Sequence, residues 1–339
     1  MTFHRVYSLA GAVAAGIGLM LSPLAAQNGS DAANVPASKM PPPIWAFPYV
    51  ESSGARPKPP DDGDKVMRVP NSDVTYTMAH IRDGYNALDW HPQDHPPMPE
   101  VVAHGRRETN VKTCGRCHLV TGQGRPENGP VGGLPAPYFI QQVKEFQSGA
   151  RRSSDMRRIA PTDMVAAVKN MTDEDLKAAA EYFASVKFKS ITKVVEAETI
   201  PKPAMKGSIY VVSETGEKEP LGERIIEVPD HVERGEIRDT HSMNTAYVPV
   251  GSIRKGEELA NGGGGKTMKC SLCHGDGLTG LASTPPIAGR SPTYIVRALY
   301  DFQSGARHGA SSPMMKGVVE TLTVNDMIAL AAYVSSLTP

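Results

Sequence analysis

The apolar residues of this 339-residue chain recur at helical spacing in two stretches that match each other. After Pro137, the positions Phe139, Val143 and Phe146 predict an amphipathic helix that Gly149 ends. A first-turn proline is compatible with such a helix, because the missing N–H would have no partner there. The second stretch runs from Pro292 to Gly305 and has the same spacing between Ile295, Leu299 and Phe302.

A second helical pattern lies further along each half of the chain. Thr172 stands three residues before Asp175, which predicts a helix N-terminus with a variant of the capping box. Thr323 and Asp326 repeat this signal. The apolar stripes that follow are Leu176, Ala179, Ala180 and Phe183 in the first half and Met327, Leu330, Ala331 and Val334 in the second. We expect both stripes to be buried in a core.

These matches belong to one internal repeat. A shift of 156 residues brings the run Phe-Gln-Ser-Gly-Ala-Arg at residues 146–151 onto the identical run at residues 302–307. Beyond that run, a shift of 151 residues superimposes Thr172 on Thr323. The sequence therefore predicts two helical domains of one kind, at residues 101–190 and 246–339.

Residues 27–100 precede the repeat and are rich in proline. Their low regularity predicts an extended segment laid over the surface, with Trp45, Phe47 and Tyr49 as anchors. His91 and His95 are candidate metal ligands there, but no carboxylate or cysteine framework accompanies them, so we do not assign a metal.

Residues 191–245 separate the two copies of the repeat. The strand-like runs at residues 208–212 and 224–228 lie on either side of a polar turn at Gly216. This arrangement predicts a two-stranded hairpin and therefore a structured linker between the domains.

The amino terminus has the three-part plan of a secretory signal peptide. A basic start precedes an apolar run at residues 9–21, and small residues close the segment at Ala25 and Ala26. We expect cleavage there, so that residues 1–26 are removed and the mature protein is periplasmic. An uncleaved membrane anchor is the alternative, but the run is shorter than the roughly 20 residues that a span needs.

All four cysteines belong to two Cys-x-x-Cys-His motifs. The motif residues are Cys114, Cys117 and His118 in the first half and Cys270, Cys273 and His274 in the second. In such a motif the two thiols add across the vinyl groups of a haem, and the histidine binds the iron. A four-cysteine zinc site or a pair of disulfides would leave both histidines unexplained. The sequence therefore predicts two covalently bound haem c groups.

Each haem iron needs a sixth ligand, for which methionine thioether is the usual choice in small electron carriers. The chain has 15 methionines, and the repeat selects two, because the shift of 151 residues superimposes Met164 on Met315. Met156 and Met314 have no methionine partner under this shift. We therefore assign Met164 and Met315 as axial ligands, with Met314 as the competitor at the second site.

A proline stands twelve residues after each motif histidine, Pro130 after His118 and Pro286 after His274. A ligating imidazole normally donates its second N–H to a fixed acceptor. We expect the carbonyl oxygens of these two prolines to be the acceptors. The alternative is that both prolines belong to ordinary turns.

Taken together, these features resemble the tandem class I cytochromes c of the c-four type, which are periplasmic proteins with two similar haem domains. The resemblance covers residues 101–190 and 246–339 and implies a mainly α protein with two tandem class I cytochrome c domains. It also implies haems that lie close enough for internal electron transfer. The matching features are the two motifs, Pro130, Pro286, Met164, Met315, the two Phe-Gln-Ser-Gly-Ala-Arg runs, and a terminal helix that contains Tyr182 or Tyr333. Here a connector with a short β-hairpin joins the two domains.

This interpretation predicts an electron carrier and not an enzyme, because two irons with histidine and methionine ligands have no open position for a substrate. We expect a quinol-oxidising complex or a periplasmic dehydrogenase as donor, and a terminal oxidase or reductase as acceptor. One alternative is a dedicated cytochrome subunit of a dehydrogenase or oxidase complex, associated with the membrane and docked through the two added segments. The other is a di-haem peroxidase.

Charge adds one expectation about partners. The chain has 36 Lys and Arg against 36 Asp and Glu, which argues against nucleic acid. Residues 101–190 nevertheless carry 14 basic against 9 acidic residues. We expect Arg151 and Arg152 in this domain to steer an acidic partner face, more than Arg290 and Arg297 in the second domain.

Overall fold

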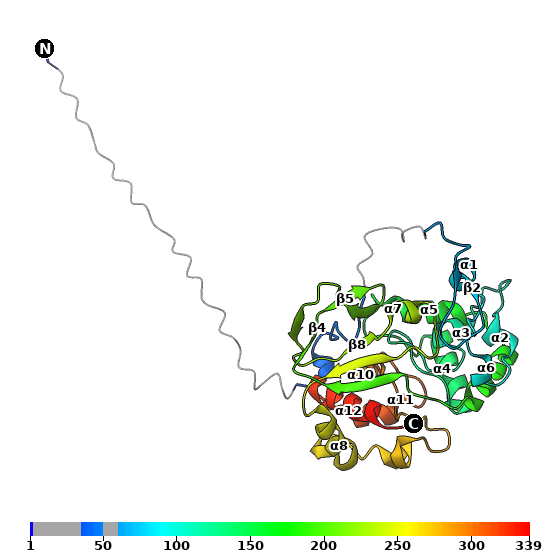
Figure 1. Cartoon of the computed structure of the whole chain (residues 1–339). Helices are drawn as coiled ribbons and strands as arrows, with labels where there is room; N and C mark the ends of the chain where they lie inside the picture. The colour runs from blue at the N-terminus through cyan, green and yellow to red at the C-terminus, as the bar shows by residue number, and fades with distance from the viewer. Residues whose placement is uncertain (3–34, 50–59) are drawn as a thin grey trace.

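The computed structural model describes residues 1–2, 35–49 and 60–339. The signal peptide predicted at residues 1–26 lies outside these residues, except for its first two. Within the described residues the fold is mainly α, as the hydrophobic pattern predicts, with several small sheets between and beside the helices (Figure 1). We call residues 101–190 the first unit, 246–339 the second unit, and 191–245 the connector.

The helices are short, and most occur in pairs related by the repeat. The α-helices are α1 (Met78–Arg82), α2 (Glu100–Ala103), α3 (Cys114–His118), α4 (Ala136–Ser148), α5 (Ile159–Val168), α6 (Asp173–Ser185), α7 (Val232–Glu236), α8 (Ser252–Gly262), α9 (Ser271–His274), α10 (Pro292–Ser304), α11 (Ser312–Val319) and α12 (Val324–Ser336). Single 3-10 turns lie at Ala37–Lys39, Pro92–Asp94, Gly263–Gly265 and Asp276–Leu278.

The helix boundaries follow the signals in the sequence. Helices α4 and α10 end at Gly149 and Gly305, which have φ of 77° and 79°. This left-handed conformation favours glycine and terminates a helix. The Thr172 side chain accepts from Asp175 N at the start of α6, and Thr323 makes a complete capping box with Asp326 at the start of α12. The predicted helices and caps are therefore confirmed.

In the described part of the chain, the strands form four small sheets. They are β1 (Val66–Met67), β2 (Tyr76–Thr77), β3 (Thr192–Glu196), β4 (Thr199–Pro201), β5 (Pro203–Lys206), β6 (Ile209–Val212), β7 (Lys218–Pro220), β8 (Ile226–Pro229) and β9 (Asn244–Val248). The pairs β1–β2, β4–β7 and β5–β6 are antiparallel, and β9 lies between β3, which is parallel to it, and the antiparallel β8.

The connector is structured, as predicted, but the predicted pairing is wrong. The run at residues 208–212 pairs as β6 with β5, which precedes it, and not with β8. Strand β8 pairs with β9 instead. All four residues of β8 are buried, so this strand needs cover on both faces and cannot belong to an isolated exposed hairpin. The boundary predicted between residues 245 and 246 falls inside β9.

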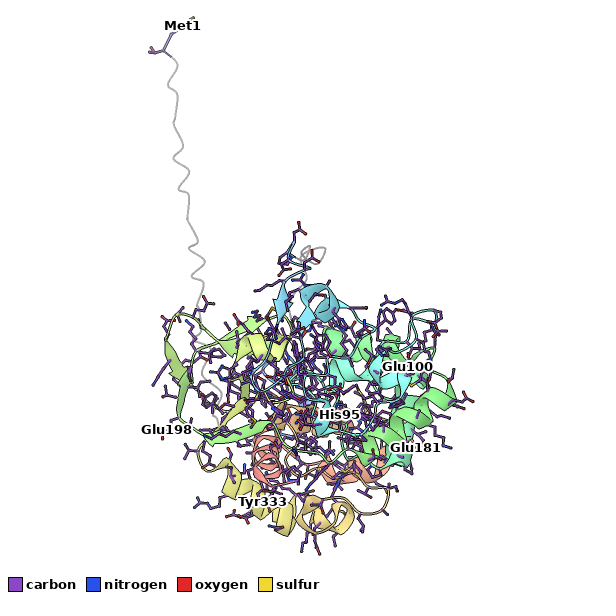
Figure 2. All side chains as sticks on the ribbon, turned by 45° about the vertical axis from the view of Figure 1, so that its right-hand side comes forward. Met1, His95, Glu100, Glu181, Glu198 and Tyr333 are labelled. Atoms are coloured by element: carbon purple, nitrogen blue, oxygen red, sulfur yellow. The ribbon has the colours of Figure 1, made fainter. Side chains whose placement is uncertain are left out.

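Each unit has its own apolar core. In the first unit, Leu176, Ala179 and Phe183 of α6 face Phe139 and Val143 of α4, and the Phe139 and Phe183 rings stack with centroids 5.7 Å apart. In Figure 2, the labelled residue Glu181 marks this unit, and Tyr333 marks the second.

Helix α12 is the centre of the second core and crosses α8 very closely. Gly256 of α8 is buried at this crossing. A Cβ at this position would overlap the backbone carbonyl of Ala329 and would lie 2.7 Å from the Cβ of Tyr333. Only glycine lets the two backbones approach this far.

The proline-rich segment is more deeply integrated than the sequence suggests. Phe47 is fully buried in the core of the second unit, where its ring lies 5.5 Å from that of Tyr300. Trp90 is buried in a separate cluster with Leu88 and donates its Nε1–H to the connector carbonyl of Ile237 at 2.7 Å. Phe47 therefore anchors the segment, as the sequence predicts, whereas Trp90 is a second buried aromatic residue that the sequence did not single out.

No single helix in the described part of the chain has the length and apolar character to cross a membrane. Helices α11 and α12 pass that test only as a pair, and they are bent by 114°.

We predict that Gly256→Ala lowers the free energy of unfolding by about 1–3 kcal/mol, because the added methyl forces α8 and α12 apart. Gly262→Ala on the same helix is the matched control, since a Cβ there meets nothing within 4 Å. Urea denaturation of both variants measures the difference. Equal stability of the two variants would contradict the close crossing.

Candidate haem sites

The two cysteine motifs form short helices, α3 and α9, at equivalent places in the repeat. Helical spacing puts the two thiols three residues apart on one side of the turn, with the histidine one residue further. All four cysteines lie in the described part of the chain and are free of disulfides. Burial raises the pKa of Cys114 to about 12.

Both motif histidines are held by a backbone carbonyl. Nδ1 of His118 lies 2.7 Å from the carbonyl oxygen of Gly129, and Nδ1 of His274 lies 2.8 Å from that of Pro285. A carbonyl only accepts, so Nδ1 carries the proton and Nε2 keeps the lone pair that a metal needs. Burial lowers the pKa of both histidines, which favours the neutral, ligating form.

The acceptors are therefore not Pro130 and Pro286 but the residues immediately before them. Successive carbonyls of an extended chain point in opposite directions, so the proline carbonyl turns away from the histidine. A proline also restricts the residue before it to extended conformations. This restriction gives a physical reason for a proline at each loop: it orients the preceding carbonyl.

The first motif opens into a cavity of about 660 Å³. This volume falls within the range of about 300–1,000 Å³ typical of cofactor sites. Cys114, Cys117, His118 and Pro130 line the cavity together with Met164, as the sequence predicts. The walls also include Tyr294 of the second unit and Arg238 of the connector, which the sequence did not predict.

Two methionines face this first cavity. Met164 of α5 and Met171, just after it, both line the wall and are partly buried against the core of the first unit. Under the repeat, Met164 matches Met315, whereas Met171 matches Leu322. The repeat therefore favours Met164 as the ligand and Met171 as a packing residue. Met171 is a competitor that the sequence alone did not indicate.

At the second site, the two candidate methionine ligands differ in how far they are buried. Met315 of α11 is partly buried against the core of the second unit. Met314 is 72% exposed. His274 of α9 is buried. The packing favours Met315 over Met314 at this site.

One buried cation joins the two histidine loops. Arg290 is 2% exposed and donates from Nε to the carbonyl oxygen of Pro286 at 2.7 Å. Its two terminal nitrogens donate across the interface to the carbonyl oxygens of Pro130 and Gly132, each at 3.0 Å. Both proline carbonyls thus bind the same guanidinium, one residue away from the two histidine acceptors.

The two Phe-Gln-Ser-Gly-Ala-Arg runs meet at this interface. Arg151 and Arg307 form an antiparallel bridge, so equivalent residues face each other. Each arginine side chain also donates to the equivalent tyrosine of the other unit, Arg151 to the hydroxyl of Tyr294 at 3.4 Å and Arg307 to that of Tyr138 at 3.3 Å. The two units therefore pack through a local two-fold arrangement.

Tyr294 brings the second unit directly against the first histidine loop. A Cβ at Gly129 would lie 2.7 Å from Cε2 of this tyrosine. Gly129 is also the residue whose carbonyl holds His118. Close contact between the units therefore requires glycine at this position.

The two arginines expected to steer a partner differ in exposure, because Arg152 is exposed and Arg151 is not. Arg151 is partly buried in the interface. Arg290 and Arg297, the comparison pair in the second unit, are 2% and 5% exposed and bond to carbonyl oxygens of other segments. The sequence counted these charges correctly but could not show which of them the interface buries.

His91 and His95 also have structural partners. His91 Nε2 lies 3.2 Å from Asp239, and His95 Nε2 lies 3.1 Å from Asp89. Among the described residues no group of three or more His, Cys, Asp or Glu side chains is arranged to hold a separate metal ion.

The residues at both motifs fit a covalent haem. Each motif provides two thiols, an imidazole fixed through Nδ1, and a methionine in the same unit. The first site also has a walled cavity that contains all these groups. We find no mismatch between these donors and the group that the motifs predict.

No family model matches the chain. Cytochrome c4 from Pseudomonas aeruginosa is 22% identical over 234 residues, covering 68% of this chain and 86% of the relative. Cytochrome c-554(548) from Halomonas halodenitrificans is 33% identical over 78 residues, covering 23% of this chain and 94% of the relative. The thiosulfate dehydrogenase electron acceptor from Stutzerimonas stutzeri is 34% identical over 86 residues, covering 24% of this chain and 38% of the relative.

A solved structure of the same kind of cytochrome is also similar to this chain. Reduced cytochrome c4 from Pseudomonas stutzeri is 21% identical, with a TM-score of 0.43 over 66% of this chain and 93% of that one.

We predict that Arg290→Met lowers the free energy of unfolding by at least about 2 kcal/mol, because three buried carbonyl oxygens lose a charged donor. The matched control is Arg254→Met on the exposed side of α8, for which we expect a change within about 0.5 kcal/mol. Urea denaturation compares the two variants. A stability loss no larger than that of the control would show that Arg290 does not hold the units together.

Proposed function

We propose, because the chain belongs to the di-haem class I cytochromes c, that it is a periplasmic carrier of single electrons between two redox proteins. The chain is an electron-transfer cytochrome with two covalently bound haem c groups. The donor we propose is a quinol-oxidising complex or a periplasmic dehydrogenase, and the acceptor is a terminal oxidase or reductase. The observation that carries this proposal is the pair of equivalent sites, each with a carbonyl-held histidine and a methionine in the same unit.

The axial ligands we propose are His118 with Met164 and His274 with Met315. The shared cavity supports the first pair, and the packing of Met315 against the core of its unit supports the second. The thiols of both motifs hold the haem edges covalently. Bound in this way, haem supplies reversible one-electron chemistry.

The chain's own residues prepare each site for that chemistry. The carbonyls of Gly129 and Pro285 fix the plane of each imidazole and raise its basicity as a ligand. A methionine bound as the second ligand would raise the reduction potential and would fill the position that a substrate needs. These features support a carrier and not an enzyme.

The thiosulfate dehydrogenase electron acceptor among the relatives supports a second candidate, a dedicated partner of one periplasmic dehydrogenase. The extension and the connector, which lie outside the repeat, would then determine the partner. Co-purification from the native periplasm and membranes distinguishes the two: a stable complex with one dehydrogenase supports the dedicated partner, and a free protein supports the mobile carrier.

We predict that Met164→Ala and Met315→Ala keep both haems attached but lower the reduction potential of one site each, because a strong sixth ligand is lost. Pyridine haemochrome spectra measure attachment, and a two-step redox titration measures both potentials. Met171→Ala and Met314→Ala are the matched controls and should leave both potentials unchanged. The assignment is wrong at any site where the control variant, and not the proposed ligand, changes the spectrum.

We also predict negligible peroxidase turnover. Two filled coordination positions leave no iron open to hydrogen peroxide, in the fully oxidised or the half-reduced protein. Peroxide-dependent oxidation of a small donor dye measures this turnover, with Met164→Ala as a control that opens one site. Rapid turnover by the half-reduced wild type would refute the carrier function and favour the di-haem peroxidase.

A further inference from the structure

Arg238 belongs to neither haem unit, yet it reaches the first site from the connector. Its Nε donates to the carbonyl oxygen of Arg116, inside the first motif, at 2.9 Å. The side chain lines the same cavity as Cys117 and His118. The guanidinium is therefore close enough to act electrostatically on the group that is attached there.

The backbone holds Arg238 in this position by unusual means. Its φ is 62°, in the left-handed region that arginine rarely adopts. Trp90 of the extension fixes the preceding carbonyl, that of Ile237, and Arg234 donates to Asp239 at 2.7 Å on the other side. Strained residues held by their surroundings occur mainly at functional sites. The extension and the connector thus cooperate to place one cation at the first haem.

Arg238 lies with two other cations. Its pKa is lowered to about 9 by burial, then by the nearby Arg125 and Arg116, so the side chain remains a cation at pH 7. Arg125 pairs with Glu127 at 3.1 Å, which offsets one charge. Arg116 donates to the carbonyl oxygens of Ile81 and Asp83 in the extension. The cluster therefore keeps a net positive charge.

The second site has apolar residues at the equivalent positions. The repeat superimposes Lys112, Arg116 and Arg125 on Met268, Leu272 and Leu281. These three counterparts are 49%, 66% and 56% exposed. Lys269 and Asp276 are the charges close to the second motif in the sequence, and their signs cancel. The two sites therefore differ in charge at their attachment helices, although their histidines and carbonyls match.

We propose that Arg238 raises the reduction potential of the first haem above that of the second, so that an electron entering at the second site passes to the first and remains there. This inference rests on the proposed function and adds the direction of internal transfer. The step is an exchange of one electron: the first iron is reduced from ferric to ferrous as the second is oxidised from ferrous to ferric. An external redox protein supplies the electron, and another removes it.

The sign follows from electrostatics. Reduction lowers the positive charge of the iron site by one, so a fixed cation stabilises the reduced form. Burial strengthens this effect, because the interaction is less screened than in water. Net charge and solvent exposure are two of the main factors that set the potentials of protein-bound iron. Net charge therefore favours the electron at the first site.

The test is a potentiometric titration of the full-length holoprotein, read by visible spectroscopy. Met164→His and Met315→His assign each midpoint to a site, because replacing the methionine ligand by histidine lowers the potential. In the wild type we expect the higher midpoint at the first site. Arg238→Gln should lower that midpoint and leave the other unchanged. Arg238→Lys keeps the positive charge and should lower the first midpoint much less.

Arg224→Gln is the matched control within the connector, since Arg224 bonds to Glu219 and does not line the cavity. It should change neither midpoint. Leu272→Arg supplies the converse variant and should raise the second midpoint. A wild type whose first site has the lower midpoint would overturn the inference, as would an Arg238→Gln variant that leaves the first midpoint unchanged. Absence of two haems by pyridine haemochrome would instead refute the proposed function.

Discussion

The guanidinium of Arg290 holds both histidine loops in one frame, and the relative placement of the two haem sites depends on it. It bonds to the carbonyl oxygens of Pro130 and Pro286, each adjacent to the carbonyl that fixes a motif histidine. A buried cation is tolerated only where its N–H groups find acceptors. Loosening the interface would remove acceptors from this cation, so the closed arrangement of the two units is strongly favoured.

The proline loops show how the same residues set local and global structure. Each proline restricts the residue before it, and the carbonyl of that preceding residue points to the histidine. The carbonyl of the proline itself points to Arg290. Orientation of the imidazoles and docking of the units therefore use alternate carbonyls of one short segment. A displacement of the interface would change the histidine bonds at both sites.

Much of this could be predicted from the sequence. The two motifs, the helices ended by Gly149 and Gly305, and the capped helices at Thr172 and Thr323 depend on local signals, and all appear as expected. Strand pairing in the connector was predicted incorrectly, because it depends on which surfaces remain to be covered. Phe47 anchors its segment as expected, but the sequence could not show which core it enters, and it did not single out Trp90, because nothing local shows which core an aromatic side chain enters.

The site was predicted less completely than its motifs. The spacing of Pro130 and Pro286 identified the correct loops but not the correct carbonyls, because a one-residue shift reverses the direction in which a carbonyl points. The sequence did contain one sign of the role of Arg290. This arginine stands where the first copy of the repeat has Leu134, so the repeat is broken at that position. A cation in place of an apolar residue marks a position where the two units no longer have the same surroundings.

The differences between the two sites arise where the repeat is broken or where chain outside it intrudes. Arg116 and Arg125 face Leu272 and Leu281 in the alignment, and Arg238 comes from the connector. The groups that bind haem are the same in both copies, so they cannot by themselves make the sites unequal. An unequal pair of sites therefore requires different residues close to one of them. Among the described hydrogen bonds of the two motif helices, the extension and the connector contact only the first, α3.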